Sequence, residues 1–250
     1  MKKASVLPAS SRQGWSATID QQNRSLSDDL EKWPRRRGLG GSFRGEILLV
    51  LGHNGAGKTT LMRAIFGLLK PAAGEVTYDG KPIAGRLPGE NVAEGIAFVP
   101  QGHGIFRTLS VHDNLELGGF IMADKAKLPA RMQTIFKLFP ILGERQQQIG
   151  GTLSGGQQQM LAIGMALMHE PRVVILDEPS IGLAPNLVDR VMQSIAEINR
   201  SFGTSILMVE QNVHYSLPIA NRVAVSKAGR KIYDGPPAHL QDDVELIKLF

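Results

Sequence analysis

The chain has 250 residues and contains no cysteine, which excludes disulfides, thiolate chemistry and cysteine-ligated zinc sites. It also lacks any stretch near the roughly 18 consecutive apolar residues that a membrane-spanning helix needs. Its basic start, Met1-Lys2-Lys3, is typical of a signal peptide, but Pro8 and Arg12 come before any apolar core of sufficient length. We therefore expect a soluble chain, or one that another protein holds at a membrane.

Aromatic residues are scarce, at 6% of the chain, and this bears on the meaning of its basic charge. The formal net charge is +5 and the isoelectric point is about 9.6, a balance that favours anionic partners. The densest basic run, residues 35–37, is short, and no aromatic residues are interleaved with it as in single-strand nucleic-acid binders. We expect a solvated basic face, which lipid headgroups could attract, and no nucleic acid partner.

Hydrophobic periodicity is missing from residues 1–44, which are polar and rich in Ser, Gln and Arg. This segment suggests a short helix over residues 26–33, with Ser27 as N-cap. We expect the rest of it to be poorly ordered, and we assign residues 1–44 to a divergent N-terminal segment. The folded domain is expected to cover residues 45–250.

Strand and helix patterns alternate from residue 46 onward. Apolar runs predict strands at residues 47–51, 75–78, 96–99, 173–176, 205–209, 223–225 and 231–233. Helical patterns cover residues 58–68, 157–169, 186–200, 213–220 and 244–250, and a mostly helical insert spans about 111–148. Residues 173–176 are apolar throughout, as in a parallel sheet that is covered on both faces. The alternation predicts an α/β fold with a mainly parallel sheet.

A glycine-rich stretch follows the first of these strands and opens the first helix. It fits the P-loop pattern of Gly, four residues and Gly-Lys-Thr, in the strand–loop–helix context that the motif requires. The glycines let backbone N–H groups surround a phosphate, to which the helix also presents its positive end. We expect Lys58 to reach the β- and γ-phosphates and the Thr59 hydroxyl to hold Mg²⁺. The stretch reads Gly52-His53-Asn54-Gly55-Ala56-Gly57-Lys58-Thr59-Thr60.

Two carboxylates, Asp177 and Glu178, follow the apolar strand at residues 173–176. Ligands of open α/β sheets bind at the carboxyl ends of the strands. Phosphoryl transfer needs both a cation site and a group that activates water. We therefore expect Asp177 to hold Mg²⁺ and Glu178 to act as the general base.

A second anion-binding nest is predicted where the helix near residue 155 begins. The Ser154 hydroxyl and the amides of Gly155, Gly156 and Gln157 lie at this helix start. One nucleotide does not need two such nests from one chain. Two chains arranged head to tail do, because each nucleotide then lies between the P-loop of one chain and the Ser154 helix of the other.

These three stretches, in this order and spacing, resemble the nucleotide-binding domain of ABC transporters over about residues 45–250. The resemblance implies a P-loop NTPase fold with a helical subdomain at about residues 102–153, ATP and Mg²⁺ as ligands, and ATP hydrolysis. It implies that Gln101 contacts Mg²⁺ or water and couples the chain to a membrane subunit. Residues 180–185 lie where the family's D-loop runs.

Within that family the chain is similar to importer ATPases for branched-chain amino acids and for related amides such as urea. The similarity is carried by the three glutamines at residues 157–159, by Gly-Leu-Ala-Pro at 182–185 and by Val-Glu-Gln-Asn at 209–212. The first two stretches look like those of the second of the two ATPases in that importer type.

Gln211 departs from the pattern of most ABC ATPases, which carry a switch histidine at this position. Similar branched-chain importer ATPases also have Gln here, so we expect Gln211 to act in hydrolysis. Its amide can hydrogen-bond the γ-phosphate or water but cannot carry a proton charge. His214 is expected on a helix surface, and Met165, where many relatives have Arg, is expected in the helical core.

The start of the chain departs further from the family, which normally opens with antiparallel strands and an aromatic residue that stacks on adenine. We recognise no such strands in residues 1–44, and Trp15 and Trp33 are the upstream candidates for stacking. The resemblance thus predicts a degenerate N-terminal β region and a weakened adenine site.

The resemblance as a whole implies an ATP-hydrolysing importer subunit that dimerises with itself or with a second ATPase. It also implies that transmembrane permease subunits hold the chain at the cytoplasmic face of the inner membrane, with a periplasmic solute-binding protein as an indirect partner. Two alternatives stay open: a catalytically weak regulatory subunit, and a soluble ABC-type ATPase that acts on DNA or ribosomes. The latter usually carries long coiled-coil inserts or two ATPase halves, and this chain has neither pattern.

Overall fold

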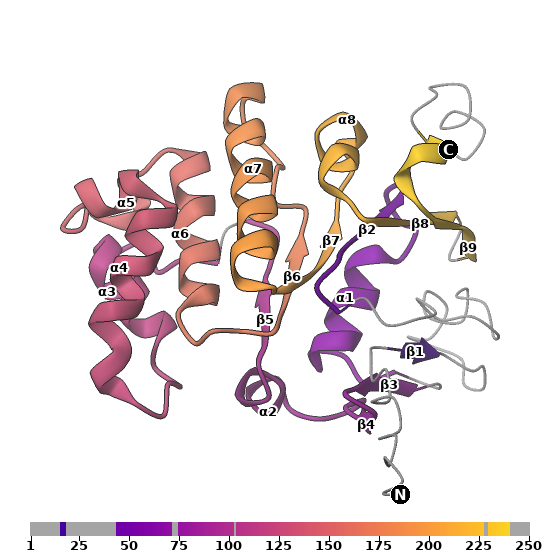
Figure 1. Ribbon diagram of the computed structural model, residues 1–250, viewed down its shortest axis with the longest axis horizontal. Coiled ribbons are helices and arrows are strands. Elements are labelled where there is room, and N and C mark those ends of the chain that lie inside the picture. Colours follow the sequence, from indigo (N-terminus) through magenta and orange to yellow (C-terminus); the bar gives the residue numbers. More distant parts are fainter. Residues whose placement is uncertain (1–15, 19–43, 72–74, 103, 228–229, 241–250) are drawn as a thin grey trace, which may run out of the picture.

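A six-stranded sheet forms the centre of the computed structural model, which describes residues 16–18, 44–71, 75–102, 104–227 and 230–240 (Figure 1). The strand order is β5-β6-β7-β2-β8-β9, and all neighbours are parallel except β8 and β9. The predicted α/β fold with a mainly parallel sheet is confirmed. The strands are β2 (Ile47–Gly52), β5 (Ile96–Val99), β6 (Val173–Asp177), β7 (Ser205–Val209), β8 (Arg222–Lys227) and β9 (Arg230–Gly235).

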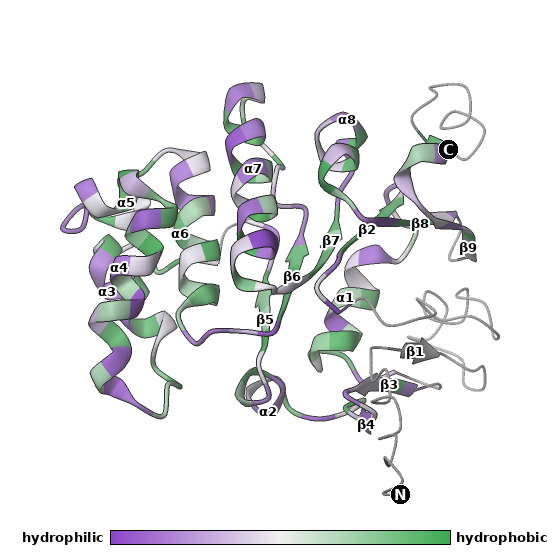
Figure 2. Cartoon of the chain, viewed as in Figure 1, coloured by the Kyte–Doolittle hydropathy of each residue, from purple (hydrophilic) through white to green (hydrophobic). Residues whose placement is uncertain are grey.

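Helices cover both faces of this sheet, because the strands are apolar on both sides (Figure 2). Along β2, Leu49 and Leu51 join the core cluster beneath α6 (Gly155–Leu167) and α7 (Pro185–Phe202). Their neighbours Leu48 and Val50 join the other cluster, with α1 (Lys58–Phe66). Every residue of β2, the strand that leads into the P-loop, is therefore buried.

The helical insert packs beside α6 at one end of the sheet. It contains α3 (Val111–Gly118), η1 (Lys125–Lys127), α4 (Leu128–Leu138), α5 (Pro140–Glu144) and η2 (Gly150–Thr152). Gly164 of α6 lets the insert approach closely, since a Cβ there would press on the side chains of Ile135 and Leu115. The insert therefore has an apolar core continuous with that of the sheet.

A second, antiparallel sheet of order β1-β3-β4 lies below α1 in Figure 1. Its strands are β1 (Ser16–Thr18), β3 (Glu75–Tyr78) and β4 (Lys81–Pro82). The sequence predicts no strand before residue 47, so β1 is a correction: Ser16 pairs with Thr77. Three residues are too few for an alternating pattern to stand out. Trp15, Trp33 and the helices predicted at residues 26–33 and 244–250 lie outside the described residues.

Most predicted elements agree with the structure to within two residues, and the exceptions have local causes. The helix predicted at residues 213–220 is α8 (Val213–Ser216) followed by η3 (Leu217–Ile219), because Pro218 cannot donate an intrahelical hydrogen bond. The short α2 (Pro88–Ala93) and η4 (Pro237–Leu240) are not predicted. Within the described ranges, no helix is long and apolar enough to cross a membrane.

Candidate active site

The P-loop connects β2 to α1, and its glycines adopt backbone conformations that other residues rarely reach. Gly55 and Gly57 have φ values of 80° and 83°, in the left-handed region. A Cβ at Gly52 would collide with the carbonyl oxygen of Ser226 on the neighbouring strand β8. The loop conformation therefore depends on glycine at these three positions.

Lys58, the first residue of α1, lies inside this loop and is only 5% exposed. Its Nζ donates hydrogen bonds to the carbonyl oxygens of Gly52 (2.7 Å) and His53 (2.9 Å). Burial lowers the pKa of Lys58, while the charges of Glu178 and Asp177 oppose that change. The structure thus holds an ammonium donor among the backbone groups that were predicted to surround a phosphate.

Asp177 and Thr59 form an oxygen-rich pair beside Lys58. The Oγ1 of Thr59 donates to Oδ1 of Asp177 over 3.1 Å, although the two residues lie far apart in the sequence. Asp177 is 2% exposed, and this burial raises its pKa, against the effect of the Thr59 hydrogen bond. Hydroxyl and carboxylate oxygens are ligands that Mg²⁺ prefers, so this pair fits a magnesium ion.

Glu178 is the residue on which the predicted catalytic side chains converge. Its Oε1 accepts a hydrogen bond from Nε2 of Gln211 at 2.6 Å, and its Oε2 accepts one from Nε2 of Gln101 at 3.3 Å. The backbone of Glu178 is left-handed, with φ 51°. A non-glycine residue with this backbone conformation is strained by on the order of 1–3 kcal/mol, so the surrounding structure must stabilise the conformation.

A cavity of about 370 Å³ joins these residues, which come from the ends of three strands and from the loop after β5. It is lined by Asn54, Gly55, Gly57, Lys58, Thr59, Thr60, Gln101, Glu178, Ile181 and Gln211. The structure therefore brings together the P-loop, the base candidate and both glutamines in one chain. Gly52, His53 and Ala56 do not line this cavity, and Asp177 is connected to it through its bond to Thr59.

The Ser154 nest lies apart from that cavity. Ser154 is the N-cap of α6, and strands β5 and β6 lie between α6 and α1 in Figure 1. The Ser154 Oγ accepts from the Gln157 backbone N–H at 3.4 Å, and the Gln157 side chain accepts from the Ser154 N–H at 3.0 Å. This reciprocal pair is a capping box, which leaves Ser154 and Gly155 exposed at the helix start.

Two further residues, Ser180 and Glu210, belong to the site, and the sequence assigns neither of them a catalytic role. Glu210 is 2% exposed and accepts hydrogen bonds from both the N–H and the hydroxyl of Ser180. A signal for it exists, because Glu210 follows the apolar strand β7 directly, just as Glu178 follows β6. By contrast, His214 is exposed on α8 and Met165 packs against the core, as predicted.

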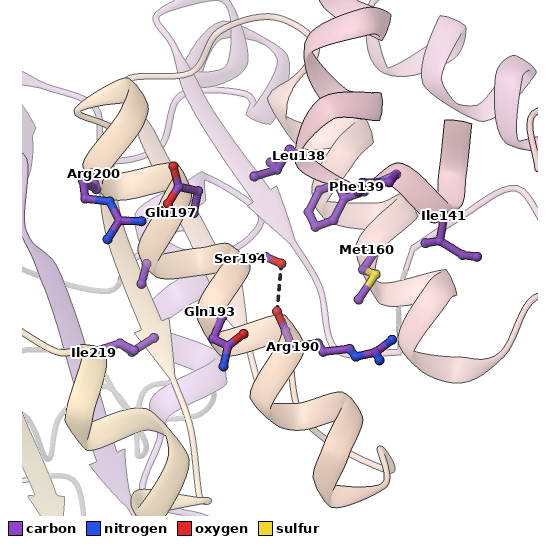
Figure 3. Close-up of a pocket in the computed structure, with 12 residues that line it drawn as sticks. Leu138, Phe139, Ile141, Met160, Arg190, Gln193, Ser194, Glu197, Arg200 and Ile219 are labelled. Atoms are coloured by element: carbon purple, nitrogen blue, oxygen red, sulfur yellow. Dashed lines mark hydrogen bonds and ion pairs between the residues drawn. The ribbon is translucent and has the colours of Figure 1, made fainter. Parts of the chain in front are cut away.

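A larger cavity, of about 690 Å³, opens between the helical insert and α7 and contains none of the predicted site residues (Figure 3). Leu138 and Phe139 face α7, on which Glu197 forms an ion pair with Arg200. No residue of the P-loop lines it. Size therefore does not identify the site here, and the convergence of buried charged groups does.

The chain is similar to several known proteins in sequence and in structure. The model of the ABC transporter family matches residues 42–181. The branched-chain amino acid transport ATP-binding protein BraG of Pseudomonas aeruginosa is 42% identical over 187 residues, which cover 75% of this chain and 79% of BraG. A probable branched-chain amino acid transport ATP-binding protein, LivF of Archaeoglobus fulgidus, is 34% identical over 82% of this chain and 87% of its own length. The structure of cbiO1 from Clostridium perfringens, part of an ABC transporter complex, superposes with a TM-score of 0.78 at 28% identity and covers 94% of each chain.

Proposed function

The chain belongs to the ABC transporter family of ATP-binding proteins, and we propose that it hydrolyses ATP to power an importer of branched-chain amino acids. The observation that supports hydrolysis most directly is the position of Glu178. Its carboxylate lines the same cavity as Lys58 and the P-loop glycines and is hydrogen-bonded by two glutamine amides. A buried carboxylate oriented at a phosphate-binding loop is suited to activate water.

The residues have separate roles in this proposal. The P-loop amides and the Lys58 ammonium bind the β- and γ-phosphates of ATP. Glu178 accepts a proton from the attacking water while the water oxygen forms a bond to the γ-phosphorus and the bond to ADP breaks. Gln211 and Gln101 hold the Glu178 carboxylate and the water in line, since both already donate to its two oxygens. The products are ADP and inorganic phosphate.

Magnesium is the cofactor that this oxygen-rich corner fits. Thr59, Asp177 and Gln101 would hold the ion, and the buried Asp177 carboxylate would contribute its negative charge. Bound Mg²⁺ supplies charge neutralisation at the β- and γ-phosphates.

Two copies, or this chain and a second ATPase, complete the site. The Ser154 helix start is exposed and lies outside the cavity that the P-loop of the same chain forms. Its neutral N–H groups and positive helix end suit the γ-phosphate bound by a partner. We place this dimer at the cytoplasmic face of the inner membrane, on transmembrane permease subunits that receive solute from a periplasmic binding protein.

Branched-chain amino acids are proposed as the solute because BraG and LivF carry that description. Deletion of the gene from its host should lower the uptake of radiolabelled leucine, isoleucine and valine. Loss of urea uptake with normal leucine uptake would favour the amide alternative instead. This experiment tests the solute and leaves the hydrolysis mechanism to the next one.

Replacement of the base tests the mechanism. Glu178→Gln keeps the shape of the side chain and removes its basicity, so we expect ATP binding to persist while turnover falls by about a hundredfold or more. The variant should also accumulate as a closed, ATP-bound dimer, which size-exclusion chromatography detects.

The matched control is Glu94→Gln, which neutralises a half-buried carboxylate paired with Arg86 at 3.7 Å. Its turnover should stay within twofold of the wild type. Near-normal turnover by Glu178→Gln would show that another group activates the water and would refute the assignment.

A further inference from the structure

Glu210 is a buried carboxylate between two loops that carry catalytic residues. It follows β7 directly, and it lies where the turn after β6 meets the loop after β7. Only 2% of its surface is exposed. Burial raises its pKa, and the hydrogen bonds that it accepts oppose this effect. A charge in such a place requires compensating donors.

Four donors supply that compensation, two from each loop. From the turn after β6, the Ser180 N–H donates to Oε1 at 2.8 Å and the Ser180 hydroxyl donates to Oε2 at 2.9 Å. From the loop after β7, the N–H groups of Gln211 and Asn212 donate to Oε2 at 3.1 and 3.4 Å. Glu210 therefore binds the two loops to each other through one side chain.

The same two loops carry Glu178 and Gln211, whose side chains hydrogen-bond to each other. Ser180 lies two residues after Glu178, whose φ of 51° requires external support. Gln211 follows Glu210 directly, and its Nε2 reaches Glu178 at 2.6 Å. Glu210 therefore binds the backbone of Gln211 itself and of Ser180, which lies two residues from Glu178. Both partners of the Glu178–Gln211 hydrogen bond are positioned in this way.

We infer that Glu210 is a positioning residue that keeps the base Glu178 and the switch residue Gln211 in register. The inference rests on the proposed hydrolysis of ATP and adds a residue to it. Glu210 does not line the phosphate cavity and so acts through its neighbours. Movement of one loop is transmitted to the other, so the turn that contains Ser180 and the Gln211 loop shift together.

The chemistry requires a carboxylate rather than an amide. Both oxygens of Glu210 face donors only, whereas the amide of a glutamine would turn an NH₂ group toward one of them. Glu210→Gln should therefore loosen one loop while preserving the volume of the side chain. Because misplacement of reacting groups by about 1 Å can cost a hundredfold, we expect kcat to fall by about ten- to a hundredfold. The KM for ATP should change by less than about threefold, since the P-loop is untouched.

A double-mutant cycle separates positioning from general destabilisation. If Glu210 acts through Gln211, Glu210→Gln should have little further effect on kcat in a Gln211→Ala background. Effects that multiply would overturn the inference, as would a wild-type kcat in Glu210→Gln. Thr204→Val is the matched control, because it removes a buried hydrogen bond, to the Pro171 carbonyl, at the other end of β7. It should leave kcat unchanged.

Amide hydrogen exchange on the full chain tests the same inference without hydrolysis. In Glu210→Gln, exchange should accelerate either at the N–H of Ser180 or at those of Gln211 and Asn212, on whichever side the amide NH₂ replaces an accepting oxygen. Unchanged exchange at all three would overturn the inference. If Glu210→Gln does not fold, Ser180→Ala removes one of the four bonds and should lower kcat by about two- to tenfold, in the range of one typical hydrogen bond. A wild-type chain without ATPase activity would refute the proposed function, while the exchange result would still decide the role of Glu210.

Discussion

The parallel strands of the six-stranded sheet begin along one side, its amino edge, and end along the other, its carboxyl edge. These two sides are built from different kinds of polar group. Within the described residues, four charged residues are buried, and all four lie at the carboxyl edge: Lys58, Asp177, Glu178 and Glu210. Asp177 ends β6, and the other three lie after the ends of β2, β6 and β7. The same edge contains the left-handed backbone of Glu178 and the P-loop glycines.

The amino edge joins the same strands with neutral side chains. The N–H of Gly45 donates to Oγ of Ser205 at 2.8 Å, and the N–H of Ile47 donates to Oδ1 of Asn221 at 2.8 Å. Asn199 on α7 donates to the carbonyl oxygens of Gly45 and Thr204. Every one of these bonds satisfies a backbone group where a strand begins.

The contrast separates function from stability within one sheet. Neutral hydrogen bonds to the backbone stabilise the start of each strand at low desolvation cost. Buried charges and strained backbone cost free energy, and such groups concentrate where a protein binds or reacts. Changes at the carboxyl edge should therefore alter activity more than stability, and changes at the amino edge should do the reverse.

The largest expected effect is the loss of the Lys58 ammonium. Lys58→Met keeps the buried stem and removes the charge, so charge-assisted hydrogen bonds to the phosphates are lost. At about 1.5–3 kcal/mol for each of two bonds, we expect the affinity for ATP to fall by about a hundred- to ten-thousandfold. Titration with a fluorescent ATP analogue measures it, and thermal unfolding should show a melting temperature close to that of the wild type.

A much lower melting temperature of Lys58→Met, with little change in its affinity for ATP, would contradict the contrast between the two edges. Lys58 would then contribute to stability rather than to nucleotide binding. Arg63→Met is a suitable control. Arg63 lies in the last turn of the same helix and outside the phosphate cavity, so its replacement should leave the affinity within about twofold.

Ser154→Arg should have the next largest effect and sharpens the account of the carboxyl edge. The bulky cation blocks the exposed helix start, which the proposal assigns to the partner's nucleotide. ATP-dependent dimerisation in a Glu178→Gln background should disappear, and turnover of Ser154→Arg alone should fall by about tenfold or more, as for a charge misplaced in an interface. Size-exclusion chromatography with ATP and a phosphate-release assay provide the two measurements.

Nucleotide binding by the Ser154→Arg monomer should stay at the wild-type level, since Ser154 lies outside the phosphate cavity of its own chain. Loss of that binding would mean that Ser154 contributes to the site in cis. Thr152→Arg, which introduces the same charge at an exposed residue just before the helix, is the matched control.

The smallest effect is expected at the amino edge. Asn221→Ala removes the acceptor of the buried Ile47 N–H, so the free energy of unfolding should fall by about 1–2 kcal/mol. Urea denaturation measures the change, and kcat and KM for ATP should remain those of the wild type. A marked loss of kcat with unchanged stability would contradict the division between the two edges.

Much of the fold could be predicted from the sequence because its strongest signals are local. Apolar runs predict the positions of strands such as β6 and β7, and the P-loop motif predicts that Lys58 begins α1. The spatial meeting of Asp177 with Thr59 followed from the rule that ligands bind at the carboxyl ends of parallel strands. These predictions needed no knowledge of long-range contacts.

The parts that the sequence did not predict depend on pairings between distant residues. Strand β1 has only three residues and exists through its pairing with β3. The role of Glu210 depends on the approach of Ser180 from another loop, which no spacing in the sequence indicates. The pair formed by Gln101 and Gln211 on Glu178 was likewise visible only in three dimensions, although each glutamine had been singled out.

The burial of Lys58 has a consequence for the thermodynamics of nucleotide capture. Its ammonium is removed from water when the chain folds, and two backbone carbonyls replace the lost hydration. Phosphate oxygens that bind there exchange with those carbonyls, so the dehydration of the cation belongs to folding rather than to association. The interaction with phosphate can then appear largely undiminished in the affinity, because the receptor is preorganised before the two molecules meet.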